Sequence, residues 1–314
     1  MEINSSQLVL FRTKFSAIFN QAYNLAQPQC EKVAFVNNVG RVEQQLYRWL
    51  QGIHAPREFI GDRVGTNMTT AGQTVVNKLW ETTIEIPKVD LERDQYGIYE
   101  PHIARLGQTV KLHQDYLVFG GLSDLIAGTS TTGITPNSYD GVAYFGPHDN
   151  GVAPFNNLIS GSLNQANLIT AITNIRNRKN SAGYPLMSAQ ERPLLVVPPA
   201  LEYTARALAT LAWFPTNAPG VTLTSPGASG ENILQGQIDV VVSPFLKTTT
   251  EWFVTVQGAV YKPILLQIEL APEFLAPPQF FNAQWSDQDI YRIGTRAAYV
   301  AAPGLPEFSV GSQG

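Results

Sequence analysis

The first repeating pattern in the sequence is helical. Between residues 5 and 26 apolar side chains recur every three or four positions, and Pro28 follows where a helix has to stop. The recurring side chains are Leu8, Phe11, Phe15, Ile18, Phe19 and Ala22. We predict an amphipathic helix over 5–26, capped by Asn4 or Ser5. Its apolar stripe belongs either to the protein's own core or to an arm that packs on another subunit.

A period of two replaces the helical pattern between Val75 and Leu91. One face holds Val76, Trp80, Ile84 and Ile86, and the other holds Glu81, Thr83 and Glu85. This alternation predicts a half-exposed strand. Because the preceding segment 61–74 is rich in turn residues, we expect a long hairpin or extended loop that leads into the strand.

The longest helical pattern follows Pro101 and ends at Gly128. Its apolar stripe consists of Ile103, Leu106, Val110, Leu117, Leu122, Leu125 and Ile126. Three interior glycines, at 107, 120 and 121, weaken a helix by about 1 kcal/mol each, which leaves room for one break. We predict a long helix that runs beside a sheet.

The middle of the chain is nearly neutral. No Lys or Arg lies between Lys111 and Arg176, and loops rich in Gly, Thr, Ser and Asn surround a short predicted strand at 142–145. We place a domain boundary in this region. The second half then alternates between a helix at 163–178 with a Ser162/Gln165 capping box, a strand at 194–197, a helix at 199–213 and a strand at 238–242. Further strands are predicted at 252–256, 264–268 and 290–300.

Composition limits the class of protein. The 314 residues are 44% hydrophobic and 15% charged, and no apolar run reaches the length of a membrane span. Neutral amides, 19 Asn and 21 Gln, nearly match in number the 21 basic and 25 acidic side chains. Because interface cores are depleted in charge, this composition suits a surface that neighbours cover, although a secreted or β-rich protein has it too.

Charge and cysteine content narrow the partners and the compartment. The net charge of −4 provides no basic footprint for sequence-specific binding of nucleic acids. The single Cys30 has no partner for an internal disulfide, and the first fifteen residues lack the pattern of a signal peptide. We therefore expect a reducing cytoplasm.

No motif for catalysis or for binding a metal or cofactor stands out. The four histidines lack the paired spacing of zinc ligands, and phosphate-binding glycine loops and nucleophile elbows are absent from the sequence. The segment from Asp90 to Asp94 has the spacing of a calcium loop, but Gln95 and Pro101 replace its essential Gly and Glu. We predict no catalytic residue, no cofactor and no metal.

Two charged groups have competing interpretations. Glu81 and Glu85 are an acid pair, but the alternation places both on the exposed face of a strand, where acid–base catalysis is disfavoured. Arg176, Arg178 and Lys179 form the densest basic spot. They either complement the dipole of the helix end, the interpretation that we favour, or mark a partner site.

Two stretches, 47–63 and 77–108, carry a family signature: a Trp-Leu-Gly tract, a Pro, an acidic-aromatic-aliphatic-Gly step with a basic residue, and a G-I-Y-x-P turn. The residues concerned are Trp49, Leu50, Gly52, Pro56, Glu58, Phe59, Ile60, Gly61, Arg63, Gly97, Ile98, Tyr99 and Pro101. In these residues the chain resembles the major head proteins of bacteriophage Mu and its prophage relatives. Weaker agreement continues to residue 205, and the segment 129–161 is shorter and richer in Gly and Asn than the family's pattern.

The resemblance implies the α+β capsid fold of tailed phages, the Hong Kong 97 type. On that plan, residues 1–54 form an N-terminal arm and 55–90 an extended loop. Residues 91–161 form a peripheral domain with a spine helix at 101–127, and 162–245 form an axial domain. The strands within 246–314 return to the peripheral domain.

The same resemblance implies a structural subunit and not an enzyme. It self-assembles into hexamers and pentamers of an icosahedral head that encloses packaged double-stranded DNA, which it contacts without sequence specificity. Scaffold, portal and decoration proteins are further expected partners, and no membrane is. The expected location is the virion capsid, assembled in the cytoplasm of a bacterial host. We expect inter-subunit contacts at Arg57, Glu58, Arg63 and Trp80, which lie in or beside a loop too extended to be stable alone.

Two alternative functions stay open on the sequence alone. Another phage structural component, such as a tail or connector protein, fits the composition equally well. A carboxylate-dependent glycan hydrolase is a less favoured third function, because it requires two buried acids in one cleft.

Overall fold

The computed structural model describes residues 5–51, 69–93, 97–149, 154–179, 184–186, 191–214, 230–257, 262–276 and 290–314. Its helices are α1 (Ser5–Leu25), α2 (Cys30–Val33), α3 (Lys88–Arg93), α4 (Tyr99–Ala127), α5 (Gln165–Arg176) and α6 (Glu202–Thr210), with short 3-10 turns η1 (Pro199–Leu201) and η2 (Pro306–Phe308). The strands are β1 (Ala34–Asn38), β2 (Gln44–Gln51), β3 (Thr69–Val76), β4 (Leu79–Pro87), β5 (Pro147–His148), β6 (Phe155–Asn156), β7 (Leu158–Ile159), β8 (Pro193–Val197), β9 (Trp213–Phe214), β10 (Gly230–Glu231), β11 (Asp239–Val242), β12 (Trp252–Val256), β13 (Ile264–Leu275), β14 (Ile290–Pro303) and β15 (Ser309–Ser312).

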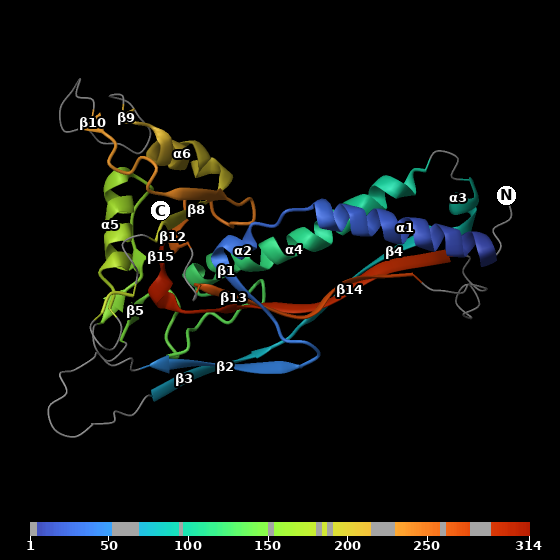
Figure 1. The fold of residues 1–314 in the computed structure, drawn as a ribbon, viewed down its shortest axis with the longest axis horizontal. Coiled ribbons are helices and arrows are strands. Elements are labelled where there is room, and N and C mark those ends of the chain that lie inside the picture. The colour runs from blue at the N-terminus through green and yellow to red at the C-terminus, as the bar shows by residue number, and fades with distance from the viewer. Residues whose placement is uncertain are drawn as a thin grey trace.

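Two parts are visible in Figure 1: a long limb and a rounder lobe. The limb is a four-stranded sheet in the order β1-β13-β14-β4, in which only β1 and β13 run parallel. Helix α4 lies along this sheet and α1 lies beside α4. The core between them contains Phe15, Phe19, Ile86, Ile103, Leu106, Val110, Tyr291 and Ile293. The apolar stripe of α1 therefore packs in the subunit's own core.

Helix α4 runs unbroken from Tyr99 to Ala127 despite its three glycines. One of them has a packing reason, because a Cβ on Gly107 would lie 2.6 Å from the backbone oxygen of Phe19 in α1. The glycine thus permits the close approach of the two helices. The helix ends at Gly128, whose φ of 67° is the left-handed conformation of a helix C-cap. The predicted helices at 5–26 and 101–127 are both confirmed.

The lobe is built on a five-stranded sheet in the order β11-β8-β12-β15-β7. Alternate residues of β8 face opposite sides: Leu194 and Val196 pack toward α4, whereas Leu195 and Val197 pack toward α5 and α6. This sheet is buried on both faces, which explains why the sequence of β8 is uniformly apolar. The strands predicted at 194–197 and 252–256 are confirmed.

The strand predicted over 75–91 is two strands and a helix. Strand β3 pairs with β2 in a hairpin, β4 pairs with β14 in the limb, and α3 begins at Lys88. The chain changes sheets at Asn77 and Lys78, so the alternation shifts phase there: Val76 is 51% exposed, whereas Ile86, predicted on the same face, is 1% exposed. The prediction for β4 itself is confirmed, since Ile84 and Ile86 face the core.

Two local predictions are wrong. No strand spans 142–145. The N–H of Ser138 donates to the Val142 carbonyl oxygen (2.8 Å) in a turn, and side-chain contacts fix Tyr144. Helix α5 is capped by Asn164, whose Oδ1 accepts from the backbone N–H of Asn167 (2.8 Å), and not by Ser162. An Asn at the cap position satisfies a free helical N–H as well as a Ser does.

The late strands divide between the two sheets. β13 and β14 pair with β1 and β4 in the limb, whereas β12 and β15 lie in the lobe. The segment expected as an extended loop, 55–90, contains β3 of the hairpin and β4 of the limb, and its residues 55–68 lie outside the described chain. The hairpin is tied to the limb by Tyr47, whose Oη donates to Gln267 Oε1 (2.8 Å).

Candidate functional site

Trp80 is anchored inside the limb. Its Nε1 donates to the backbone oxygen of Tyr299 (2.8 Å), and its ring meets the His113 ring edge-on with 4.7 Å between centroids. His113 Nδ1 lies 2.8 Å from Tyr299 Oη. Burial lowers the pKa of the His113 imidazole and raises the pKa of the Tyr299 hydroxyl. The other expected contact residues, Arg57, Glu58 and Arg63, lie outside the described residues.

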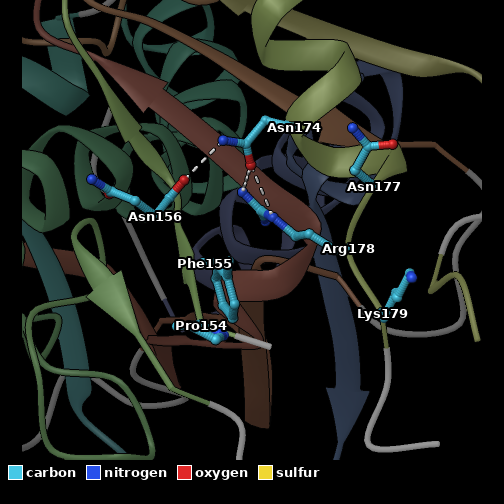
Figure 2. A pocket seen from close by; sticks show the side chains of 7 residues that line it. All are labelled: Pro154, Phe155, Asn156, Asn174, Asn177, Arg178 and Lys179. Atoms are coloured by element: carbon cyan, nitrogen blue, oxygen red, sulfur yellow. Dashed lines mark hydrogen bonds between the residues drawn. The ribbon is translucent and has the colours of Figure 1, made fainter. Parts of the chain in front are cut away.

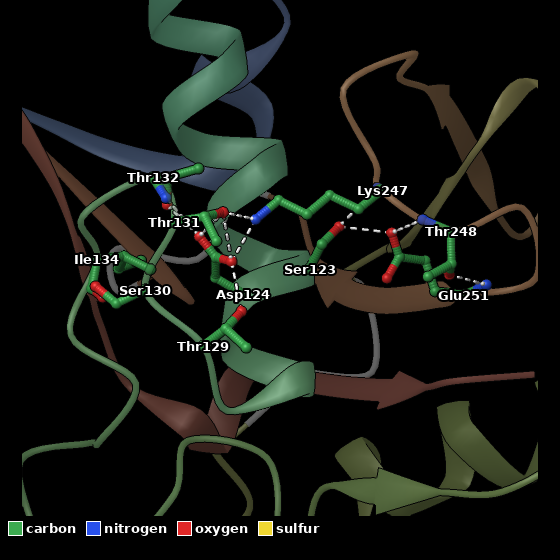
Figure 3. A network of polar contacts seen from close by, with 10 residues as sticks. All are labelled: Ser123, Asp124, Thr129, Ser130, Thr131, Thr132, Ile134, Lys247, Thr248 and Glu251. Atoms are coloured by element: carbon green, nitrogen blue, oxygen red, sulfur yellow. Dashed lines mark hydrogen bonds and ion pairs between the residues drawn. The ribbon is translucent and has the colours of Figure 1, made fainter.

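A buried carboxylate ties the end of α4 to the loop that follows it (Figure 3). Asp124 accepts from Thr129 Oγ1 (2.7 Å), from Thr131 Oγ1 (3.0 Å) and from both the backbone N–H and Oγ1 of Thr132 (2.7 Å each). Lys247 adds an ion pair. Burial alone would raise the pKa of this carboxyl, but the hydrogen bonds from Lys247 and the threonines hold it well below its usual range. Asp124 is therefore ionised, and it takes hydrogen bonds from three threonines and Lys247.

Ser123 extends this network into the lobe. Its Oγ donates to Glu251 Oε1 (2.5 Å) and accepts from the backbone N–H of Lys247 (3.1 Å), and Glu251 Oε1 also accepts from the backbone N–H of Thr248 (3.1 Å). Residues 247–251 lead directly into β12, the central strand of the lobe sheet. We call this set the joint: residues 123, 124, 129–132 and 247–251. It fixes the orientation of the limb's long helix relative to the lobe.

Arg178 braces the C-terminal segment. The side chain is buried, and its Nη1 donates to the carbonyl oxygens of Pro306 (3.0 Å), Glu307 (2.5 Å) and Ser309 (2.9 Å). Nη2 also donates to Asn174 Oδ1 (2.8 Å), as Figure 2 shows. Burial lowers the pKa of the guanidinium to about 10, so it keeps its charge at neutral pH.

These contacts correct the favoured interpretation of the basic spot for Arg178, whereas Arg176 lies in the last turn of α5 as that interpretation expects. Arg178 neutralises no helix end, because its hydrogen bonds go to the main chain around η2 and to the side chain of Asn174. The guanidinium also lies 4.7 Å from the centroid of the Phe155 ring. Beside it opens a pocket of about 360 Å³ that Asn156, Asn177 and Lys179 help to line (Figure 2). Arg178 is a structural brace.

Many of the large apolar side chains that are exposed on the described surface belong to three parts of the molecule. One group is on α1, one lies near the base of the β2–β3 hairpin, and one lies at the outer end of the lobe. The groups are Val9, Leu10 and Leu25; Val42, Leu46, Val76 and Leu79; and Tyr203, Leu211, Trp213 and Ile233. Grouped exposure of this kind is typical of surfaces that a partner covers.

The second group borders a groove of about 400 Å³ on the limb. Leu79, Leu270 and Ala298 provide apolar walls, and side chains of both charge signs surround them. The polar lining residues are Arg41, Glu43, Asn77, Glu269 and Arg296. A surface of alternating charge favours a partner of matching pattern over a uniformly charged polymer.

Glu81 and Glu85 are not buried together in the structure. Glu81 and Glu85 are exposed on the outer face of β4; Glu85 pairs with Arg292 (2.7 Å) and Glu81 lies opposite Arg296 in the strand register. In the described part of the chain, no group of three or more His, Cys, Asp or Glu side chains is placed to hold a metal ion. None of the described helices is long and apolar enough to cross a membrane.

Comparison with known proteins points to one family. Residues 8–157 match the family model of the Mu-like prophage major head subunit gpT. The chain is 37% identical over 99 residues to the Mu-like prophage FluMu major head subunit of Haemophilus influenzae, which covers 32% of this chain and 30% of that protein. It is 28% identical over 145 residues to the major capsid protein of Escherichia phage Mu, covering 46% and 45%. The matches thus span less than half the length of either relative.

The likeness in structure extends over the lobe as well as the limb. A chain in the procapsid of bacteriophage JBD30 superposes with a TM-score of 0.55 at 19% identity, covering 99% of this chain and 76% of that one. At this identity the likeness establishes the fold, and the α+β fold expected from the sequence is confirmed. Residues 8–157 are therefore similar to the Mu-like prophage major head subunits, and the chain as a whole has the fold of phage capsid proteins of the Hong Kong 97 type.

Proposed function

We propose that this protein is the major capsid subunit of a Mu-like phage or prophage, a structural protein that assembles with copies of itself into a closed head around packaged double-stranded DNA. The observation that carries the proposal is the agreement of two comparisons: the Mu-like head family over residues 8–157 and a procapsid fold over 99% of the chain. A tail or connector protein has no such support, and the described acids give a glycan hydrolase no paired carboxylates.

The geometry suits assembly. An elongated limb with an attached hairpin offers more edges for neighbours than a rounded domain does (Figure 1). Exposed apolar side chains lie on α1, near the base of the hairpin and at the outer end of the lobe. Interfaces of standard size bury roughly 1,600 Å² each, and their repetition around every subunit sums to a strong shell from individually weak contacts. The joint would let each subunit transmit load between limb and lobe without bending.

The finer parts of the proposal concern organisation and partners. We assign an N-terminal arm to 1–54, an extended loop to 55–90, a peripheral domain to 91–161 and an axial domain to 162–245. Within 246–314 we assign β13 and β14 as the returning strands, since β12 and β15 lie in the lobe sheet. Hexamers and pentamers, contacts with scaffold, portal and decoration proteins, and non-specific contact with DNA belong to the same proposal. So do assembly in the bacterial cytoplasm and a final location in the virion capsid.

Expression of the full chain, followed by size-exclusion chromatography and electron microscopy, tests the proposed function. We expect closed shells of megadalton size, or six-fold and five-fold rings. Open tubes would indicate a tail protein and a single dodecameric ring a connector. A stable monomer under all assembly conditions would refute self-assembly.

The expected inter-subunit contacts need a selective test. Because Trp80 packs inside the limb, Trp80→Ala would disturb the subunit itself, so a charge reversal is the better probe. We expect Arg57→Glu combined with Arg63→Glu to abolish shells while the unassembled subunit keeps its wild-type melting temperature. The control is Arg206→Glu on α6, which breaks only an exposed ion pair with Glu202. Normal shells from the double variant would remove Arg57 and Arg63 from the interface.

A further inference from the structure

Glu307 is a buried acid in η2, immediately before the last strand, β15. Its side chain is 8% exposed. Oε1 accepts a hydrogen bond from Tyr139 Oη (2.6 Å), whereas Oε2 is buried without a hydrogen-bond partner in the described structure. The backbone N–H of Glu307 itself also supports its carboxylate. A carboxylate has about four acceptor positions, so these two neutral donors leave the charged form poorly supported.

The charged groups around Glu307 are committed to other acceptors. Arg178 directs its N–H groups to main-chain carbonyls and to Asn174. The ring nitrogens of His148 lie 2.7 Å from Asp140 Oδ2 and 2.9 Å from the Tyr144 carbonyl oxygen. Both cations attract Glu307 only at longer range. Burial outweighs this attraction and the Tyr139 hydrogen bond, and it raises the pKa of Glu307.

The segment that carries Glu307 holds the lobe sheet together. β15 lies between β12, to which it is antiparallel, and β7, to which it is parallel, and its four residues are buried. The buried hydroxyl of Tyr144 meets the start of this segment, donating to Pro263 O (2.8 Å) and lying 3.1 Å from Ser309 Oγ. Release of the segment would return Glu307 to water, where the ionised form is stable.

We propose that Glu307 makes the C-terminal segment, residues 305–312, a proton-linked latch: the seated segment holds this acid neutral, and loss of its proton loosens the segment from the sheet. The sign follows from linkage. A carboxyl group whose pKa is higher in the seated state takes up a proton when the segment binds to the sheet. The segment is therefore held most strongly below the ordinary pKa of Glu, and it is held less strongly as pH rises from there toward the raised pKa. The latch rests on contacts within the lobe and is independent of the proposed capsid function.

Hydrogen–deuterium exchange between pH 5 and pH 9, corrected for intrinsic exchange rates, tests the latch on the full chain. In the wild type we expect protection of the peptide 304–314 to fall as pH rises, by up to roughly tenfold for each unit by which the pKa is raised. In Glu307→Gln the corrected protection should be independent of pH. The matched control is Glu202→Gln, on the exposed face of α6 and paired with Arg206, which should behave as the wild type.

A second variant covers the case in which Glu307→Gln does not fold. Tyr139→Phe removes the donor that supports the ionised carboxylate, so it should lose more protection of 304–314 at pH 9 than at pH 5. An unchanged pH profile in this variant would overturn the latch. A Glu307→Gln profile that keeps the wild-type slope would assign the effect to another group, such as His148 with Asp140. Parallel loss of protection in β8 would mean that the whole lobe opens, and it too would overturn a local latch.

Discussion

Asp124 and Glu307 are both buried acids at the junction of a loop and a regular element, yet their pKa values shift in opposite directions. Asp124 takes hydrogen bonds from three threonines and Lys247, and its pKa lies below the ordinary value. Glu307 is supported by Tyr139 and by its own backbone N–H, its Oε2 has no partner in the described structure, and its pKa lies above the ordinary value. Burial is common to both, so the number of donors, and not burial, decides whether a buried acid stabilises a junction or loosens it.

The strongest test of this comparison is Asp124→Asn. The substitution keeps the shape but removes the charge and turns one acceptor into a donor that faces Lys247 and the threonines. We expect a loss of about 3 kcal/mol in the free energy of unfolding, measured by urea denaturation of the unassembled subunit. The control Asp239→Asn removes an exposed ion pair with Arg192 (3.8 Å) and should change stability by less than about 0.5 kcal/mol. Equal losses in both variants would contradict the assignment of the joint to Asp124.

The pH dependence of the two acids should have opposite signs. Because the pKa of Asp124 is depressed in the folded state, its contribution is present above the ordinary Asp value and is lost as pH falls through the folded value. The stability gap between wild type and Asp124→Asn should therefore narrow below about pH 4. For Glu307→Gln, the difference in the free energy of unfolding from the wild type should instead shift in favour of the variant as pH rises above the ordinary pKa of Glu. Urea denaturation over pH 2 to 8 measures both; a gap for Asp124→Asn that is constant to pH 2 would exclude its ionisation as the cause.

The smallest expected effect compares two threonine hydroxyls. Thr131 Oγ1 donates to Asp124, whereas Thr255 Oγ1 in β12 is buried and has no partner in the described structure. Thr131→Val should cost about 1 kcal/mol, while Thr255→Val should be neutral or stabilise by up to about 1 kcal/mol, because it removes an unsatisfied polar group. Thermal denaturation of the two variants measures the difference. A larger loss for Thr255→Val would show that its hydroxyl has a partner.

Long periodic segments were predictable from sequence because their apolar repeat runs over many residues, so that a single irregular position does not hide it. The stripe of α4, with a Pro near its start and Gly128 at its end, defines the helix. Gly107 could not be interpreted from the same pattern, since its reason is the backbone of α1, far away in sequence. The strand predicted at 75–91 failed at Asn77 and Lys78, where the chain leaves one sheet for another without a Gly or Pro to mark the change.

The polar clusters were less predictable than the elements that carry them. Arg178 was interpreted as a helix-end cation because it follows a helix, whereas its partners are carbonyls about 130 residues further along the chain. Glu307 has no sequence signal beyond an acid between Pro306 and Phe308 in a stretch poor in charge. The threonines after Gly128 offered a usable signal: a run of hydroxyl residues directly after a helix whose last turn contains Asp124 predicts a local hydrogen-bonded loop.

The position of β15 between β12 and β7 has a consequence for biosynthesis. Strand β7 joins the lobe sheet only through β15, so the sheet stays incomplete until residues 309–312 have left the ribosome. Until then, one edge of β12 has no hydrogen-bonded neighbour. A nascent chain that stops short of residue 309 would present that edge to other chains. Closure of the lobe is thereby a check that translation has reached this point.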